Sequence, residues 1–359
     1  MNTSPPRSLH QVPGRPSPTL EDLALAAGVS RSTASRAING GDRVSPEARA
    51  AVDRAVADLG YIPNRAARSL VTRRTSSIAL VIPEPDVRVM MDPFFAVVIT
   101  GITEALRETD VQLVLLMSRT GDDSARTLRY LRGGHVDGAI VVSHHRADSW
   151  ARSLSETGLP TIFIGRPWDT ASDVTYVDTD NEGGGRLAAR HLAGIGRRRL
   201  ATVAGPADMT AAVDRLRGWQ AGLRDAGLPE GPVVHADFTT DGAAAAARQL
   251  LTDHPDVDGI FAASDLMALG VLEAVHASGR TVPGDIALMG YDNHAVAGTA
   301  STPLTSITQS IMQMAVRAGA MLLEEIEAPG SHPEPVVYST ELVERASTMV
   351  APRASAVKA

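Results

Sequence analysis

The feature that most constrains this chain is a series of short apolar runs between Ile78 and Gly290. Stretches with helical amphipathicity separate the runs, for example residues 94–108 and 183–193. The runs are IALVIP (78–83), VQLVLLM (111–117), GAIVVS (138–143), TIFIG (161–165), LATVAG (200–205), GIFAAS (259–264) and IALMG (286–290). Strands of parallel sheets are near-continuously apolar because helices cover both faces. The pattern therefore predicts an α/β region of two doubly wound subdomains, with a ligand crevice at the carboxyl ends of the strands.

The composition adds limits on location and chemistry. With 359 residues, 44% of them hydrophobic and 21% charged, the chain can form several globular domains. It has no cysteine, which excludes disulfides and Cys-ligated metals. No apolar run is long enough to cross a bilayer, and the Pro- and Ser-rich residues 1–18 lack the apolar core of a signal peptide. We therefore expect a disordered leader, no membrane partner, and a cytoplasmic, nucleoid-associated protein.

The net charge of −7 is unevenly distributed. Residues 1–74 contain eleven Arg and six Asp or Glu, a balance of +5, so the rest of the chain carries −12. Locally placed cations are what a protein needs to neutralise DNA phosphates. This distribution indicates that only the basic residues 1–74, which we call the head, bind a polyanion, and that the acidic remainder of the chain does not.

Three short helices are predicted in that head. Thr19 and Asp22 form a capping-box pair before the first helix, which Gly28 ends. Ser30 caps a second helix over residues 31–39, with Ala34, Ala37 and Ile38 on its buried face. Ser45 and Pro46 begin a third helix that ends at Gly60. Two short helices joined by a tight turn containing glycine are typical of the helix-turn-helix arrangement.

The second helix carries the predicted function. Its outward positions are Arg31, Ser32, Ser35 and Arg36. An arginine at the start of such a helix can enter the major groove and donate two hydrogen bonds to guanine. Short polar side chains suit phosphate oxygens, which fix the register without reading the sequence. The predicted phosphate contacts are Ser30, Thr33, Ser35 and Asn39.

The segments TLEDLALAAGVSRSTASRAING and VSPEARAAVDRAVADLGYIPNRAARSL closely resemble the DNA-binding head and hinge of the lactose/galactose repressor family (LacI/GalR). The pairing of AGVS with GYIPN is the most specific part of this match. The resemblance implies that Arg31 and Ser32 choose the bases and that Arg36 also reaches a base edge. It places Thr19 and Asn64 among the DNA contacts as well. The implied helix-turn-helix domain is 19–62, followed by a hinge helix and linker over 63–74.

In that family the paired hinges of a dimer insert a leucine into the central minor groove. Leu70 occupies this position, with the small Ala67 beside it, and Arg68 stands where glutamine is more usual. An apolar wedge can unstack a base step and bend the DNA. The alternative is that Leu70 is an ordinary core residue of a helix. Because so short a hinge cannot form a stable helix alone, we expect at least a homodimer on a near-palindromic operator.

The resemblance extends to the family's sensor domain, which is similar to periplasmic sugar-binding proteins. The matching motifs are DPFF (92–95), GGHVDGAIV (133–141), VDTDNEGG (177–184), RLRGW (215–219), FAASDLMALG (261–270), MGYDN (289–293) and TPLTSITQ (302–309). It implies an effector-binding domain over 75–350, in which the chain crosses three times between the subdomains. The expected subdomains are 75–175 with 308–327 and 176–307 with 328–350, before a flexible tail at 351–359.

The effector site is predicted from the same motifs. Arg215 matches a family arginine that grips effector hydroxyls or carboxylates, and Asp292 matches an acceptor for the effector. Phe238 falls at an aromatic position, and Phe95 is expected to face it from the other subdomain; Asp265 and Gln309 are further candidates. Two rings with an Arg and an Asp suit a carbohydrate. Two alternatives stay open: Phe95 as a core residue and Arg215 as a surface ion-pair residue.

Other motifs do not predict chemistry. His144-His145 has no partner at metal-ligand spacing and is better interpreted as a loop after a strand. Gly183-Gly184-Gly185 lacks the Lys-Ser/Thr of a phosphate loop and is interpreted as a flexible helix start. We find no catalytic constellation and expect no enzyme activity, cofactor or metal. A sugar-transport receptor would explain the sensor domain but not the basic head. The sequence therefore predicts an effector-controlled regulator, most simply a repressor that binds double-stranded operator DNA.

Overall fold

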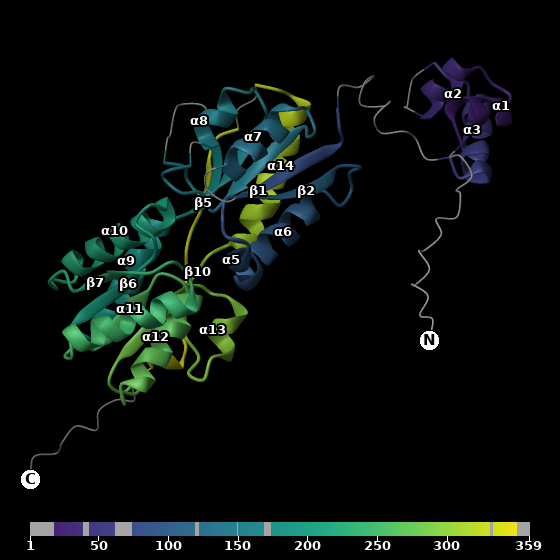
Figure 1. The fold of residues 1–359 in the computed structure, drawn as a ribbon. Coiled ribbons are helices and arrows are strands. Elements are labelled where there is room, and N and C mark those ends of the chain that lie inside the picture. The colour runs from purple at the N-terminus through teal and green to yellow at the C-terminus, as the bar shows by residue number, and fades with distance from the viewer. Residues whose placement is uncertain are drawn as a thin grey trace, which may run out of the picture. The chain divides into compact units, whose positions relative to one another are not determined.

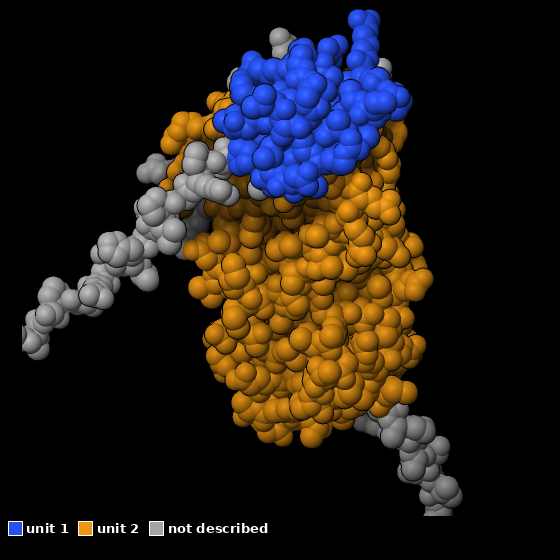
Figure 2. Space-filling view, turned by 90° about the vertical axis from the view of Figure 1, so that its right-hand side faces the viewer, with its two compact units in different colours: residues 1–75 blue, residues 76–359 orange. Residues whose placement is uncertain are grey.

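The computed structural model describes residues 18–38, 43–61, 74–118, 122–148, 150–168, 174–330 and 333–349. The chain divides into two compact units, residues 1–75 and 76–359 (Figure 2). Several sequence predictions lie outside the described residues: most of the leader, the tail, Asn39, and the hinge positions Asn64, Ala67, Arg68 and Leu70.

The first unit contains the three predicted helices, α1 (Leu20–Ala26), α2 (Arg31–Ile38) and α3 (Pro46–Leu59). The capping box forms as expected, because Thr19 accepts from the amide of Asp22 and the Asp22 carboxylate accepts from the amide of Thr19. Ser45 caps α3, and Gly60 ends it in the left-handed conformation, where glycine avoids the steric cost of a Cβ. The core of the unit consists of Leu23, Ala24, Ala34, Ala37, Val52, Ala55 and Tyr61.

The second unit contains two six-stranded sheets (Figure 1). The first sheet is entirely parallel, in the order β11-β5-β4-β3-β1-β2. Its strands are β1 (Ser77–Ile82), β2 (Gln112–Met117), β3 (Gly138–Val142), β4 (Thr161–Ile164), β5 (Thr175–Thr179) and β11 (Val336–Tyr338). Its helices are α5 (Asp86–Met91), α6 (Pro93–Ala105), α7 (Asp122–Arg132), α8 (Trp150–Ser155) and α14 (Ile311–Glu327).

Alternate residues of β1 show why the sequence of this strand is continuously apolar. Ile78 and Leu80 pack on one face with side chains of α6 and α14. Ala79 and Val81 pack on the other face with side chains of α7 and α8. Both faces of the strand are therefore buried, as expected for a doubly wound sheet.

The second sheet has the order β12-β10-β9-β8-β6-β7, and only β12 runs antiparallel to its neighbour. Its strands are β6 (Leu200–Ala204), β7 (Val233–His235), β8 (Gly259–Ala262), β9 (Ala287–Asp292), β10 (Thr305–Thr308) and β12 (Leu342–Val343). Side chains of α9 (Asn181–Gly194) and α10 (Thr210–Asp225) cover one face. Side chains of α11 (Thr240–Asp253) and α12 (Asp265–Ala277) cover the other. The short helices α13 (Ala295–Thr299) and η1 (Ala346–Thr348) complete the subdomain.

The chain crosses between the two sheets after β5, after β10 and between β11 and β12. The sequence-based boundaries were therefore wrong at three places, the smallest being residue 308, which belongs to the second subdomain because it pairs with Asp292. Residues 176–179 belong to the first subdomain, because β5 pairs with β4, and so do residues 336–338, because β11 pairs with β5. The physical reason for these errors is that backbone pairing decides which sheet a strand joins. β11 is an edge strand of three residues, and its short apolar pattern does not show which strand it pairs with.

Candidate functional site

The outer surface of α2 presents the side chains predicted to read DNA. Arg31, Ser32 and Arg36 are exposed, whereas Ala34 and Ala37 face the core. The Ser30 hydroxyl accepts from the amide of Thr33 and lies 2.9 Å from the hydroxyl of Ser32. These side chains form one polar surface at the start of the helix, the end that enters the major groove in helix-turn-helix proteins.

Among the described residues, the two arginines of this surface make only exposed contacts. Arg31 pairs with Glu21 of α1 at 2.6 Å, and their side chains are 69% and 62% exposed. Arg36 donates from Nε to the carbonyl oxygen of Ser32 at 3.1 Å. Exposed ion pairs contribute little to stability, typically less than about 1 kcal/mol. Each guanidinium group can therefore give up its present acceptor and bind a DNA base or phosphate instead.

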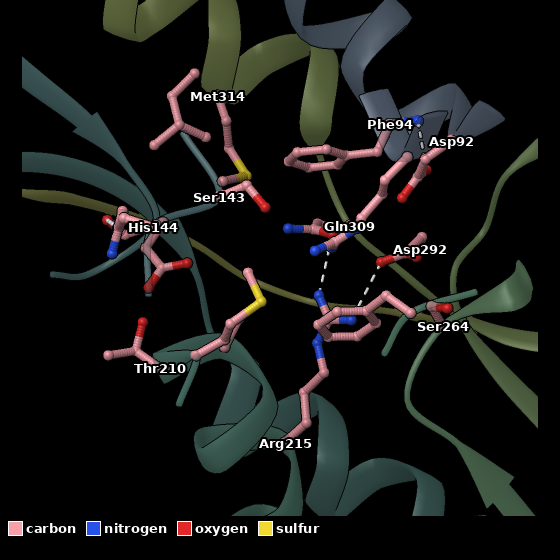
Figure 3. Close-up of a pocket in the computed structure, with 17 residues that line it drawn as sticks. Asp92, Phe94, Ser143, His144, Thr210, Arg215, Ser264, Asp292, Gln309 and Met314 are labelled. Atoms are coloured by element: carbon pink, nitrogen blue, oxygen red, sulfur yellow. Dashed lines mark hydrogen bonds and ion pairs between the residues drawn. The ribbon is translucent and has the colours of Figure 1, made fainter. Parts of the chain in front are cut away.

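The second unit contains a cavity between its two subdomains (Figure 3). It holds about 650 Å³ of empty space, part of it open to solvent. Residues that follow the carboxyl ends of strands in both sheets line it, as predicted for a doubly wound fold. The lining residues are Arg88, Asp92, Phe94, Ser143, His144, Ile164, Gly165, Asp178, Met209, Thr210, Ala211, Arg215, Phe238, Ser264, Asp292, Gln309 and Met314.

Arg215 is the most highly connected polar residue of the cavity. Its side chain is 4% exposed and donates to Asn181 Oδ1 (2.9 Å), the carbonyl oxygen of Ala263 (2.5 Å) and Gln309 Oε1 (3.1 Å). One guanidinium nitrogen lies 3.3 Å from Asp292 Oδ1, and Tyr291 stacks beneath the guanidinium plane at 3.7 Å. These contacts fix the arginine before any ligand arrives, and they show that it is not a surface ion-pair residue.

Close packing of α9 against α10 places Arg215 at this depth. A Cβ at Gly185 would lie 2.1 Å from the carbonyl oxygen of Arg215, and a Cβ at Gly218 would lie 1.9 Å from that of Glu182. Gly184 and Gly185 are buried within α9. The triple glycine does lie at the start of α9, but Gly185 has a packing role, because it allows α9 and α10 to approach each other closely, while a Cβ at Gly184 would meet the Tyr291 side chain.

Two buried carboxylates lie close together at this end of the second sheet. Burial raises the pKa of Asp292 to about 6, against the opposing effect of Arg215. Burial, followed by repulsion from Asp292, raises the pKa of Asp265 to about 8. Only Asp292 lines the cavity: Asp265 is fully buried and accepts from the Ser306 hydroxyl and the His294 amide. The prediction that Asp265 faces the effector is corrected accordingly; its carboxylate links the start of α12 to β10.

The aromatic walls are Phe238 and Phe94, which replaces the predicted Phe95. Phe95 is fully buried with Val98 and Ile102 in the core of the first subdomain, whereas Phe94 lines the cavity. The reason is helical geometry, since consecutive residues of α6 point about 100° apart. Phe238 and Asp292, together with Ser143, have positive φ angles of 61°, 98° and 59°. Such strain in residues other than glycine concentrates at functional sites.

Sequence reasoning missed Arg88 and Asp92, which line the cavity from the first subdomain. Arg88 pairs with the buried Glu84, and its guanidinium lies 5.3 Å from the centre of the Phe238 ring. Its Nε is buried without a hydrogen-bond partner among the described residues. Burial raises the pKa of Asp92, which caps α6 by accepting from the amide of Phe94. The sequence signal for Arg88 was a single arginine inside the apolar stretch 87–91, and Asp92 is the first residue of the DPFF motif, from which only Phe95 was chosen.

His144 and His145 lie in the loop after β3, where the sequence placed them, and their environments differ. Burial lowers the pKa of His144 to about 4. A hydrogen bond to Glu84 raises the pKa of His145 to about 9, with a smaller contribution from Asp208. Because Asp208 belongs to the second subdomain, the 2.9 Å contact between His145 and Asp208 joins the two subdomains beside the cavity.

The described helices include none that is both long and apolar enough to cross a membrane. Comparison with protein families matches residues 19–64 to "Bacterial regulatory proteins, lacI family" and residues 189–348 to "Periplasmic binding protein-like domain". The transcriptional regulator CelR of Thermobifida fusca is 46% identical over 333 residues, covering 92% of this chain and 98% of CelR. The chain belongs to the LacI family of bacterial regulatory proteins. It is a DNA-binding transcription regulator with an α/β sensor domain.

Other LacI-family proteins align over the same length. The ribose operon repressor of Escherichia coli K12 is 33% identical, with 92% of this chain and 99% of that protein covered. A solved structure of a CelR–cellobiose complex matches with a TM-score of 0.74 and 44% identity, covering 92% of this chain and 99% of that one. The Lac repressor dimer bound to operator and an anti-inducer matches with a TM-score of 0.82 and 25% identity, at the same coverage.

Proposed function

We propose that this LacI-family regulator is a repressor whose affinity for operator DNA is controlled by a neutral β-linked glucose disaccharide of the cellobiose type. The observation that carries the proposal is the inter-subdomain cavity, in which a fixed arginine–aspartate pair lies between aromatic side chains. The similarity to a regulator solved with cellobiose supports the choice of sugar. The proposed site of action is the bacterial chromosome in the cytoplasm.

The cavity chemistry suits a sugar ring, which presents an apolar face and a rim of hydroxyl groups. Phe94 and Phe238 offer apolar surface for the ring faces. Asp292 and Asp92 can accept from hydroxyl groups, and Arg88 Nε, which is buried without a partner in the described structure, can donate to one. Among the sequence-predicted effector residues, we retain Arg215, Phe238, Asp292 and Gln309 as ligand contacts.

Control of DNA binding follows from the position of the cavity. A ligand that contacts both subdomains binds most strongly to one relative arrangement of them, and it shifts the equilibrium by its differential affinity. Typical coupling of about 1–3 kcal/mol changes operator affinity on the order of 5- to 150-fold. The bond between His145 and Asp208 is one of the contacts that such a change would alter.

On the DNA side, we propose that Arg31, Ser32 and Arg36 contact bases and that Thr19, Ser30, Thr33 and Ser35 contact the backbone. The position of the first three on the exposed surface of α2 supports this division. We further propose a homodimer on a near-palindromic operator, with the hinge residues Asn64, Ala67, Arg68 and Leu70 and the helix-end Asn39 as additional contacts. The related Lac repressor was solved as a dimer on its operator.

The test is a fluorescence anisotropy titration on a duplex selected from random DNA with the wild-type protein. We expect cellobiose to change the operator affinity on the order of 5- to 150-fold and ribose or purines to leave it unchanged. Arg31→Ala should reduce discrimination against scrambled DNA by about 1–3 kcal/mol.

The matched control is Arg126→Ala, which removes an equally exposed arginine paired with Asp123 in the second unit. It should behave like wild type. An Arg31→Ala protein that keeps the wild-type specificity ratio would refute base reading by Arg31. A wild-type protein that responds to no carbohydrate would refute the proposed effector.

A further inference from the structure

A second and larger hollow adjoins the inner cavity. It holds about 2210 Å³ of empty space including the part open to solvent, and Arg88, Asp92 and Phe238 line both spaces. We call it the outer groove. Its walls come from the segment that follows β1 in the first subdomain and from the β7–α11 loop in the second. These three residues therefore form the boundary between the inner cavity and the outer groove.

One wall of the groove is unusually apolar for a surface. Pro83, Pro85, Val87 and Met91 line it, and Val87 and Met91 are 75% and 74% exposed. Both side chains stand on α5, which is anchored by the buried Val89 and by the ion pair between Arg88 and Glu84. The opposite wall includes Phe238 and Leu266. Phe238 and Leu266 thus add apolar side chains to a wall that also contains Asp237, Thr239, Thr240 and Asp241.

The polar groups of the groove define the charge of its occupant. Asp208, Asp237 and Asp241 supply exposed carboxylates, while Arg88 and the protonated His145 are both engaged with Glu84. Carboxylates accept hydrogen bonds from hydroxyl groups and repel anions. Apolar walls combined with hydroxyl acceptors suit an uncharged sugar rather than a phosphorylated one.

We propose that the outer groove is a subsite for additional glycosyl units, so that the effector class includes neutral oligosaccharides longer than a disaccharide. This inference rests on the proposed function, because the inner cavity must first hold the leading sugar rings. Val87 and Met91 contact the added ring and determine how much affinity it contributes. Arg88, at the junction of the two spaces, donates from its buried Nε to the part of the chain that passes between them.

The experiment is isothermal titration calorimetry of the full-length protein with cellobiose and with cellotriose. We expect wild type to bind cellotriose more tightly than cellobiose, by on the order of three- to tenfold, because an apolar surface receives the third ring. Met91→Ser and Val87→Ser should reduce this ratio to within about twofold and leave the cellobiose affinity unchanged.

Met90→Ser is the matched control. Met90 is 67% exposed on the same helix and does not line the groove, so this variant should keep the wild-type ratio. Thermal unfolding of all three variants, whose side chains are largely exposed, establishes that they fold. If wild type binds both sugars equally, or if Met90→Ser lowers the ratio as much as Met91→Ser, the subsite is refuted while the proposed function stands. If neither sugar binds, both are refuted.

Discussion

Replacing Asp292 with asparagine tests the effector cavity with little disturbance of its shape. The substitution removes the carboxylate and keeps the side-chain volume. Arg215 loses its ion pair at 3.3 Å but keeps three acceptors, on Asn181, Ala263 and Gln309. Arg215→Ala would be a poorer test, because it leaves a buried carboxylate unpaired at a cost of about 3–5 kcal/mol.

The expected effect follows from the burial of Asp292, whose side chain is 10% exposed. A hydrogen bond to a charged group contributes roughly 1.5–3 kcal/mol net. Its loss should weaken effector binding on the order of 10- to 150-fold. Operator affinity without effector should stay within about twofold of wild type, since Asp292 lies in the second unit and not in the head.

Calorimetry with cellobiose measures the first quantity, and anisotropy on a selected operator measures the second. Asp265→Asn is the matched control, because it removes a neighbouring buried carboxylate that does not line the cavity. It should leave effector affinity within about twofold of wild type. Unchanged cellobiose binding in Asp292→Asn, or an equal loss in Asp265→Asn, would refute the assignment of Asp292 as the acceptor.

Two further predictions concern stability. The raised pKa of Asp265, about 8 against 3.8 for the unfolded group, means that its contribution is fully present below pH 3.8 and is lost as the pH rises toward 8. Urea unfolding should therefore show Asp265→Asn gaining stability relative to wild type between pH 5.5 and 8.5, and a constant difference would contradict this. Gly185→Ala should destabilise by about 1–3 kcal/mol, because its Cβ would meet the Arg215 carbonyl at 2.1 Å. Gly194→Ala, in the same helix with nothing within 4 Å, should instead be neutral or stabilising by up to about 1 kcal/mol, and equal effects of the two substitutions would refute the close-packing argument.

Local signals made the head and the central strands predictable. Caps such as Thr19 and Ser45 act within one helical turn, so the sequence alone locates the helix starts. Strands buried on both faces, such as β1 and β3, carry a continuous apolar run for the same reason. These elements depend little on distant residues.

The missed strands depend on distant partners. β10 has the sequence TSIT, and its Thr305 and Ser306 side chains are satisfied by Arg345 and Asp265 rather than by apolar packing. β11 and β12 are edge strands of three and two residues, defined by pairing with β5 and β10. No local pattern distinguishes such segments from loops.

The sequence predicted which types of residue line the effector cavity better than it predicted which individual positions do so. The motifs located Arg215, Phe238, Asp292 and Gln309, all of which line the cavity. To decide whether Phe94 or Phe95 lines the cavity, one must know how α6 is rotated about its axis, and tertiary packing sets that rotation. Predicting that Arg88 lines the cavity would have required knowing that α5 lies across from Phe238, and the two are close only in the folded chain.

The interleaving of the two sheets along the chain has a consequence for biosynthesis. The helices α1 to α3 are contiguous and share one core, so the head can fold as soon as it leaves the ribosome. The edge strands β11 and β12 are made last: β5 is unpaired on one side until Tyr338 has emerged, and β10 until Val343 has emerged. Open strand edges are templates for aggregation. A nascent or truncated chain ending before Val336 therefore has a finished DNA-binding head and two incomplete sheets, so one late break disables both halves of the sensor at once.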